Sequence, residues 1–461
     1  MLRPLLLLTV ASFPAFAEQP NVVFIAVDDL RPELGCYGVE TIQTPNIDRL
    51  AAQGTTFLNS FCNIPVCGAS RASVLTGMRP TRNRFLDYDT RVEQDTPEAV
   101  TIPGHFKANG YHSVGFGKIA HFRDDKAGDW SEAPWRPDFP GEKEEQVGWQ
   151  DYQLPFNNEI VKQRDGGSSW PYESADVPDD AYFDGKVANK AAETIETLAK
   201  ASQPFFVAVG FVKPHLPFNA PKRYWDLYDR EQFSLPENYY PPRNAPGAAI
   251  HQFGELRSYY GVPKEGPLSD EMAITLIHGY HAATSYADAC VGTILDAIEA
   301  SGEADNTIVV LWGDHGWNLG EHTLWCKHAN FMTSLRAPLI ISPPGGKRQS
   351  AKEMVEFIDI YPTLCDLAEI PKPKQLEGQS LAPNLDNPEK DDREAVHLRW
   401  KDAATIKTRD FSYTEWTNDE GQLWGKMLYD HRTDPEENVN VVDDPAYQET
   451  VEGLAKRLIR K

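Results

Sequence analysis

The sequence predicts an α/β fold, with a large and mostly parallel sheet sandwiched by helices and a small C-terminal α+β domain containing an antiparallel sheet. Short, continuously apolar runs alternate with helical patterns, as expected for parallel strands that are buried on both faces. From about residue 386 the pattern changes to a period of two, which is typical of antiparallel strands. The 461 residues are enough for one large and one smaller domain.

Five apolar runs are predicted to be the strands of the large sheet, and helices are expected between them. Strands are expected at 21–27, 111–117, 204–210, 307–312 and 337–342. Helices are expected at 44–54, 180–201, 269–302 and 356–370, the last of them with a kink at Pro362. The stretches 123–180 and 219–268 are rich in Pro, Gly and Trp, so they are interpreted as long loops over the sheet or as disordered segments.

The two ends of the chain have characters of their own. Residues 1–17 resemble a secretory signal peptide: Arg3 precedes an apolar run too short to span a bilayer, and Ala15-Phe16-Ala17 is a small-x-small cleavage site. We therefore expect an exported protein, periplasmic or secreted, with a large domain at 18–385. A small domain is expected at 386–461, with strands at 403–408, 411–417 and 425–431 and a closing helix at 446–461.

Composition limits the classes of partner. The formal net charge of −23 argues against nucleic acid, and an anionic substrate would need a locally basic pocket. No segment after the signal is apolar enough to predict membrane insertion. The six cysteines match no zinc-site spacing; some could pair in an exported protein, but the sequence does not choose the pairs. It does not predict the oligomeric state either.

Acids, lysines and histidines follow four of the predicted strands. Ligands of open α/β sheets bind outside the carboxyl ends of the strands, so these side chains are expected to share one crevice. Each pair alone is more typical of a turn or a helix cap, but their coincidence at one edge favours a functional site. In chain order the pairs are Asp28 and Asp29, Lys118 and His121, Lys213 and His215, and Asp314 and His315.

The three aspartates of this set predict a metal site. Adjacent carboxylates raise each other's pKa unless a cation lies between them. Oxygen ligands favour Ca²⁺ or Mg²⁺, while His315, as a softer donor, leaves Mn²⁺ open; we favour Ca²⁺.

The stretch CGASRASVLTG, residues 67–77, adds a nucleophile and an anion site. Cys67 lies at the start of a short helix that Gly77 ends, and exposed N–H groups at a helix start attract anions. Arg71 lies one turn in, and Lys118, Lys213 and Lys327 add positive charge. A site with a cation, a nucleophile and these positively charged side chains is suited to bind a tetrahedral oxyanion.

The same stretch resembles the signature of the type I sulfatases, members of the alkaline-phosphatase superfamily in which the cysteine is oxidised to formylglycine (3-oxoalanine). Motifs such as GFVKPHLPF and DHGWNLGEHTLWCKHANF extend the resemblance, and KPHLPF and DHGWNLGEH point to the iduronate-2-sulfatase-like group. Ala69 occupies a position at which many members have proline. That departure leaves open which formylglycine-generating maturation enzyme would act on Cys67.

The resemblance implies a role for each candidate residue. The calcium ligands would be Asp28, Asp29, Asp314, His315 and the modified Cys67. Arg71 would hold the formylglycine hydrate, Lys118 and Lys327 would bind sulfate, His121 would lie beside the formylglycine, and His215 would lie near the leaving oxygen. Lys213 and Trp317 are expected to bind substrate.

Three functions are compatible with these residues. The favoured one is hydrolysis of sulfate esters on a polysaccharide or glycosaminoglycan-like sugar, such as a 2-O-sulfated uronate or an algal glycan, through a formylglycine hydrate made from Cys67. The second is hydrolysis of phosphate mono- or diesters, or of phosphonates, on the same sheet. The third is a non-catalytic glycan-binding protein, which the intact set of acids, lysines and histidines disfavours.

Overall fold

The structure is a computed structural model that describes residues 19–137, 150–164 and 167–460. The predicted signal peptide lies outside the described residues. Among those that are described, no helix has both the length and the apolar character needed to cross a membrane.

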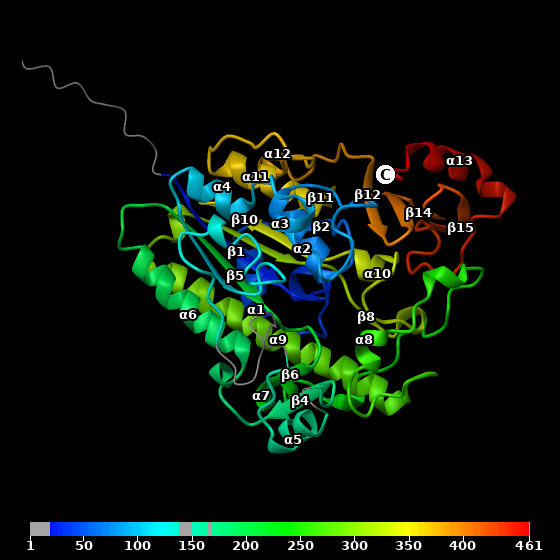
Figure 1. The fold of residues 1–461 in the computed structure, drawn as a ribbon, viewed down its shortest axis with the longest axis horizontal. Coiled ribbons are helices and arrows are strands. Elements are labelled where there is room, and N and C mark those ends of the chain that lie inside the picture. Colours follow the sequence, from blue (N-terminus) through cyan, green and yellow to red (C-terminus); the bar gives the residue numbers. More distant parts are fainter. Residues whose placement is uncertain (1–18, 138–149, 165–166, 461) are drawn as a thin grey trace, which may run out of the picture.

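A seven-stranded sheet forms the centre of the fold, in the order β11-β2-β10-β7-β1-β5-β3 (Figure 1). β1 pairs in parallel with β5 and β7, and β3 pairs in parallel with β5, as the apolar runs predicted. The bounds are β1 Asn21–Val27, β2 Thr55–Phe61, β3 His112–Gly117, β5 Phe205–Phe211, β7 Thr307–Gly313, β10 Leu339–Ser342 and β11 Gln349–Glu356.

The structure corrects the predicted sheet in two respects. β10 runs antiparallel to both β2 and β7, whereas the sequence suggested a parallel strand; an apolar run encodes burial but not direction. β2 and β11 were not predicted. β2 interrupts its apolar residues with Thr, Asn and Ser, and β11 is an edge strand that is partly exposed, so neither has a continuous apolar pattern.

Helices cover both faces of the sheet, because alternate residues of β1 point to opposite sides. Val23, Ile25 and Val27 pack with α1 (Pro45–Ala51), α6 (Phe183–Leu198) and α9 (Asp270–Ser301). On the other face, β1 packs with α2 (Cys67–Thr76), α4 (Ile102–Ala108) and α11 (Ile360–Leu367), and α12 (Ala382–Asp386) lies over the same face (Figure 1).

The long helix α9 follows its sequence signals closely. Ser269 is the N-cap and accepts a hydrogen bond from the Met272 N–H, and Gly302 ends the helix in the left-handed region at φ 79°. The predicted helix 356–370 is shorter in the structure, since residues 349–356 belong to β11 and a 3₁₀ turn precedes α11.

The two stretches interpreted as loops or disorder contain regular elements in their described parts. These are α5 (Pro155–Gln163), β4 (Tyr172–Ala175), β6 (Phe218–Pro221), α7 (Lys222–Trp225) and α8 (Gly254–Arg257). β4 and β6 pair with each other in parallel. The remaining short elements are α3 (Val92–Asp95), β8 (Asn318–Leu319), β9 (Trp325–Cys326) and α10 (Met332–Leu335).

A four-stranded antiparallel sheet forms the C-terminal part of the chain. Its strands are β12 (Ala395–Trp400), β13 (Ala403–Thr408), β14 (Phe411–Thr417) and β15 (Leu423–Asp430), followed by α13 (Gln448–Arg457). One face packs on residues of the large domain, among them Ala249 and Leu324, and the other packs on α13. The antiparallel α+β character is as predicted; β12 was missed, and a domain boundary at residue 385 stays a prediction.

Candidate active site

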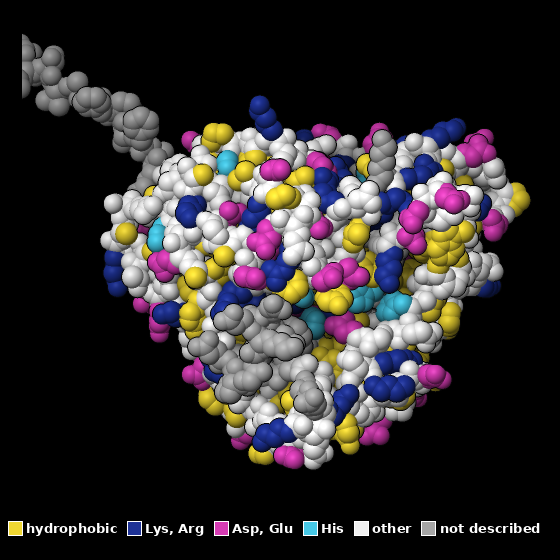
Figure 2. All heavy atoms as spheres, in the orientation of Figure 1, with side chains coloured by type: hydrophobic (Ala, Val, Ile, Leu, Met, Phe, Trp, Pro, Cys, Tyr) yellow, Lys and Arg dark blue, Asp and Glu magenta, His cyan; other side chains and the backbone are white. Residues whose placement is uncertain are grey.

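A cavity of about 580 Å³ opens beyond the carboxyl ends of β1, β3, β5 and β7. Figure 2 shows histidine side chains gathered in a recess near the middle of this face. The cavity is lined by Val66, Cys67, Tyr88, Lys118, His121, Phe122, Gln150, Ser168, His215, Glu255, Ser258, Tyr259, Lys327 and His328.

Neighbouring strands bring the three aspartates together. Asp28 and Asp29 follow β1, Asp314 follows β7, and all three are fully buried. The Asp29 N–H donates to Asp314 Oδ1 at 3.0 Å. Arg71 lies between Asp28 and Asp314: its Nη2 donates to Asp28 Oδ1 at 3.1 Å and its Nε donates to Asp314 Oδ2 at 2.9 Å. The guanidinium thus fixes the separation of two carboxylates that would otherwise repel each other.

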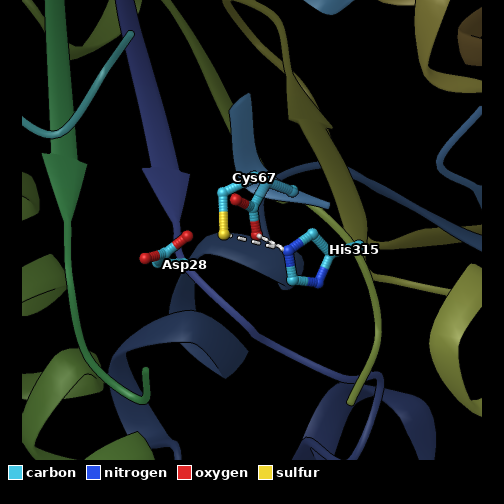
Figure 3. Close-up of side chains that lie close together, drawn as sticks. Asp28, Cys67 and His315 are labelled. Carbon is cyan, nitrogen blue, oxygen red and sulfur yellow. Dashed lines mark hydrogen bonds and ion pairs between the residues drawn. The ribbon is translucent and has the colours of Figure 1, made fainter. Parts of the chain in front are cut away.

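Cys67 is the first residue of α2, and its side chain points into this acidic cluster. Its Sγ lies 3.2 Å from His315 Nε2 and 3.9 Å from Asp29 Oδ1 (Figure 3). The next residue must be small, because a Cβ on Gly68 would lie 2.0 Å from the Tyr88 carbonyl oxygen. Burial, together with the charge of Asp28, raises the pKa of the Cys67 thiol to about 12. An unmodified Cys67 is therefore a poor thiolate nucleophile.

The donor atoms at this point fit a divalent cation. Two overlapping groups of four residues each offer one ligand atom per residue, and within each group these atoms lie within 4.8 Å of one another. The groups are Asp28, Cys67, Asp314 and His315, and Asp28, Asp29, Cys67 and His215. Burial raises the pKa of Asp29 well above its usual range in spite of Lys327. A cation beside these carboxylates would favour their charged forms.

Lysines and histidines form the wall of the cavity. Lys118 Nζ donates to Asp28 Oδ2, and Lys327 Nζ lies 3.2 Å from both carboxylate oxygens of Asp29. Burial, helped by the nearby charge of Lys118, lowers the pKa of His121 well below its usual range. His121 is therefore a neutral imidazole.

Three predicted site residues lie behind the cavity wall in the described structure. Lys213 Nζ donates to the carbonyl oxygens of His215 at 3.0 Å and of Pro217 at 2.6 Å, so it supports the backbone of its loop. Trp317 is 1% exposed, and Lys327 Nζ lies 4.9 Å from its ring. Neither side chain is among the residues that line the cavity, and the expected contact of both with substrate stays a prediction. Arg71 is also fully buried, and its expected contact with a formylglycine hydrate stays a prediction.

Several cavity residues were not predicted from the sequence. Glu255 lies on α8, Tyr88 follows α2 along the chain, and His328 adjoins Lys327. Glu255 and Tyr88 belong to no motif and follow no strand of the sheet, so strand-end reasoning had no signal for them. His328 is next to a predicted residue but carried no pattern of its own.

All six cysteines are free thiols.

Comparison with known proteins gives a consistent picture. The profile of the sulfatase family matches residues 20–370, and that of the C-terminal region of N-sulphoglucosamine sulphohydrolase matches residues 320–461. The chain is 32% identical to iduronate 2-sulfatase of Mus musculus over 79% of this chain and 73% of that protein. It is also 32% identical to a sulfatase of Formosa agariphila over 96% of this chain and 87% of that protein.

Solved structures share the fold at lower identity. BT4656, in complex with its substrate D-glucosamine-2-N,6-O-disulfate, is 21% identical, with a TM-score of 0.72 over 95% of this chain and 96% of that chain. A phosphonate monoester hydrolase from Silicibacter pomeroyi is 22% identical, with a TM-score of 0.75 over 95% of this chain and 94% of that chain. On the match of the family profile and of these relatives, the chain belongs to the sulfatase family and is a sulfuric ester hydrolase.

Proposed function

We propose that this sulfatase removes sulfate from a sulfated carbohydrate, with a formylglycine made from Cys67 at its reactive centre. One observation carries the proposal: Cys67 lines a cavity together with lysines and histidines, and its sulfur lies within 4.8 Å of a ligand atom from each of two aspartates and a histidine. A buried thiol with a pKa of about 12 has little use as a nucleophile, but it is well placed as a precursor.

The proposed metal is Ca²⁺, held by Asp28, Asp29, Asp314 and His315 together with the modified Cys67. Three fully buried carboxylates in one cluster support a hard cation with oxygen ligands. Mg²⁺ and Mn²⁺ are the alternatives, and His315 is the ligand that favours Mn²⁺. The ion would offset negative charge at the centre to which the sulfate ester must come.

The side chains of the chain itself account for binding and proton transfer. A formylglycine at position 67 would supply, as its hydrate, an oxygen nucleophile for the sulfur of the ester. Lys118 and Lys327 lie on the cavity wall, where they bind sulfate oxygens and offset their charge. His215 or Lys327 donates a proton to the leaving sugar oxygen, and His121, which also lines the cavity, accepts the proton that the nucleophile gives up. Arg71 keeps Asp28 and Asp314 at a fixed separation throughout.

The names of the relatives support a sulfated sugar as substrate. They include iduronate 2-sulfatases and an ulvan-active sulfatase of Formosa agariphila. We propose a 2-O-sulfated uronate or an algal glycan unit, handled after export to the periplasm or the medium. Maturation of Cys67 would require a formylglycine-generating enzyme that accepts alanine at position 69.

A panel of substrates tests the proposal. Protein with Cys67 converted is incubated with sulfated oligosaccharides, and with an aryl sulfate and the matching aryl phosphate and phosphonate esters. We expect release of inorganic sulfate at a rate far above that of phosphate or phosphonate cleavage. A preference for the phosphorus esters would favour the second hypothesis, to which the fold is equally suited.

A further inference from the structure

We propose that Glu255 is a positioning residue. It holds His215 and Lys327, the two candidate proton donors to the leaving oxygen, at the wall of the cavity. The inference rests on the proposed function, in which His215 or Lys327 protonates the leaving oxygen. A single carboxylate oxygen of Glu255, Oε1, lies 2.9 Å from Lys327 Nζ and 3.1 Å from His215 Nε2. All three side chains line the same cavity.

The backbone that carries Glu255 is firmly held. The neighbouring Leu256 is 1% exposed and packs in an apolar cluster with Phe218 and Tyr280. Arg257 donates to the carbonyl oxygens of three residues in the flanking turns, and its guanidinium lies 3.9 Å from the ring centroid of Phe253. The carboxylate of Glu255 therefore projects from a fixed point into the cavity.

Lys327 depends on Glu255 for its position. Among the described residues, its only other ion-pair partner is Asp29, whose oxygens both lie 3.2 Å from Nζ. If Asp29 binds a cation, as proposed, its oxygens are engaged by that ion. Glu255 is then the acceptor that keeps the ammonium on the cavity side, above the ring of Trp317 at 4.9 Å.

The orientation of His215 depends on the same oxygen. Its Nδ1 lies 2.5 Å from the carbonyl oxygen of Leu216, which can only accept, so Nδ1 is the donor in that contact. Nε2 lies 3.1 Å from Glu255 Oε1, and it can donate to that oxygen only in the imidazolium, which is also the form that can protonate a leaving group. The second oxygen of Glu255, Oε2, is buried and has no hydrogen-bond partner among the described residues. The contacts of this carboxylate with Lys327 and with His215 thus both involve Oε1.

A role of Glu255 in proton donation would make the rate of cleavage depend on the leaving group, whereas a purely structural role would not. A poor leaving group needs a proton in the transition state, whereas a good one departs as a stable anion without it. Loss of Glu255 should therefore slow the cleavage of esters with poor leaving groups most.

The test compares Glu255→Gln with wild-type protein on 4-nitrophenyl sulfate and phenyl sulfate, each with Cys67 conversion measured by mass spectrometry. We expect kcat for phenyl sulfate to fall at least about 10-fold more than kcat for 4-nitrophenyl sulfate, with KM changed less than about 3-fold. Glu255→Asp should restore part of the difference. Glu265→Gln, an exposed change in the same segment, should leave the ratio unaltered.

An equal loss on both esters, or no loss on either, overturns the inference. Thermal unfolding of each variant shows whether an equal loss comes from a damaged fold. If the wild-type protein cleaves neither ester nor any sulfated sugar, the proposed function fails and this inference fails with it. If the wild-type protein is active but Glu255→Gln leaves the ratio of kcat values for the two esters unchanged, only the role of Glu255 is overturned.

Discussion

The Cys67 sulfur lies 3.2 Å from Nε2 of His315, although 248 positions separate the two residues along the chain. Cys67 begins α2, whereas His315 follows the central strand β7, so the contact depends on the docking of α2 against the carboxyl end of the sheet (Figure 3). The chemistry proposed for the protein depends on this contact and on the acids around it.

Cys67→Ala should abolish sulfate release, because the methyl group of alanine has no sulfur or oxygen from which the formylglycine aldehyde could be made. We expect a fall of at least about 10³-fold in kcat with the fold retained, measured by sulfate release and by circular dichroism. Cys36→Ala, which removes a partly exposed thiol outside the cavity, serves as the control and should stay active. Full activity of Cys67→Ala would favour a mechanism without this residue.

Arg71→Lys should be destabilising as well as inactivating. A lysine has no planar fork with which to contact Asp28 and Asp314 together, so part of a fully buried charge network loses its partner. Breaking a buried ion pair costs about 3–5 kcal/mol, and the conservative change should cost somewhat less. Thermal unfolding should show a lower Tm than wild type. The ion pair of Arg223 with Asp179 at the surface offers a control: Arg223→Lys should leave the Tm almost unchanged.

Removal of divalent cations should lower both activity and stability. A ligand that binds only the folded state raises the free energy of unfolding by an amount that grows with its concentration. We therefore expect dialysis against a chelator to lower the Tm, and millimolar Ca²⁺ to restore it more fully than Mg²⁺ or Mn²⁺. The Asp314→Asn variant should lose this response to Ca²⁺. A wild-type Tm and activity that ignore both chelator and added metal would argue against a bound cation.

Asp288 provides a pH-dependent test of stability away from the active site. On α9 it accepts hydrogen bonds from the backbone N–H groups of Asn46, at 3.1 Å, and Ile47, at 2.7 Å, at the start of α1. Asp288→Ala leaves these groups unpaired and should cost about 1–3 kcal/mol.

The sign of the pH dependence follows from the pKa of Asp288, which burial raises from 3.8 to about 6. Between these values the folded state binds more protons than the unfolded state, so the contribution of Asp288 falls as the pH rises. The difference in Tm between wild type and Asp288→Ala should therefore be larger at pH 5 than at pH 7.5. The exposed change Asp305→Ala should show no such trend, and a difference that grows with pH would contradict the assignment.

Much of the fold could be predicted because burial leaves a clear pattern in the sequence. β1, β5 and β7 are buried along their whole length and read as continuous apolar runs. The sequence missed β11, because an edge strand that is partly exposed has no continuous apolar pattern. It gave β10 the wrong direction, because apolar content does not report whether a strand runs parallel or antiparallel to its neighbours.

The candidate site was predictable where its residues follow strands. Asp28, Asp314 and Lys118 come directly after β1, β7 and β3, and the topology of a parallel sheet brings such residues together. Glu255 reaches the cavity from α8, a four-residue helix whose position depends on tertiary packing. The hydrogen bonds of Lys213 were equally hidden, since they depend on carbonyl groups of the loop that follows.

The central claim is that sulfate ester hydrolysis depends on conversion of Cys67. The most direct measurement prepares the protein with different fractions of Cys67 converted, quantifies each fraction by mass spectrometry of the Cys67 peptide, and measures sulfate release by the same samples. The account predicts a rate that rises in proportion to the converted fraction and extrapolates to almost zero for the plain thiol. A rate that is independent of conversion would contradict it.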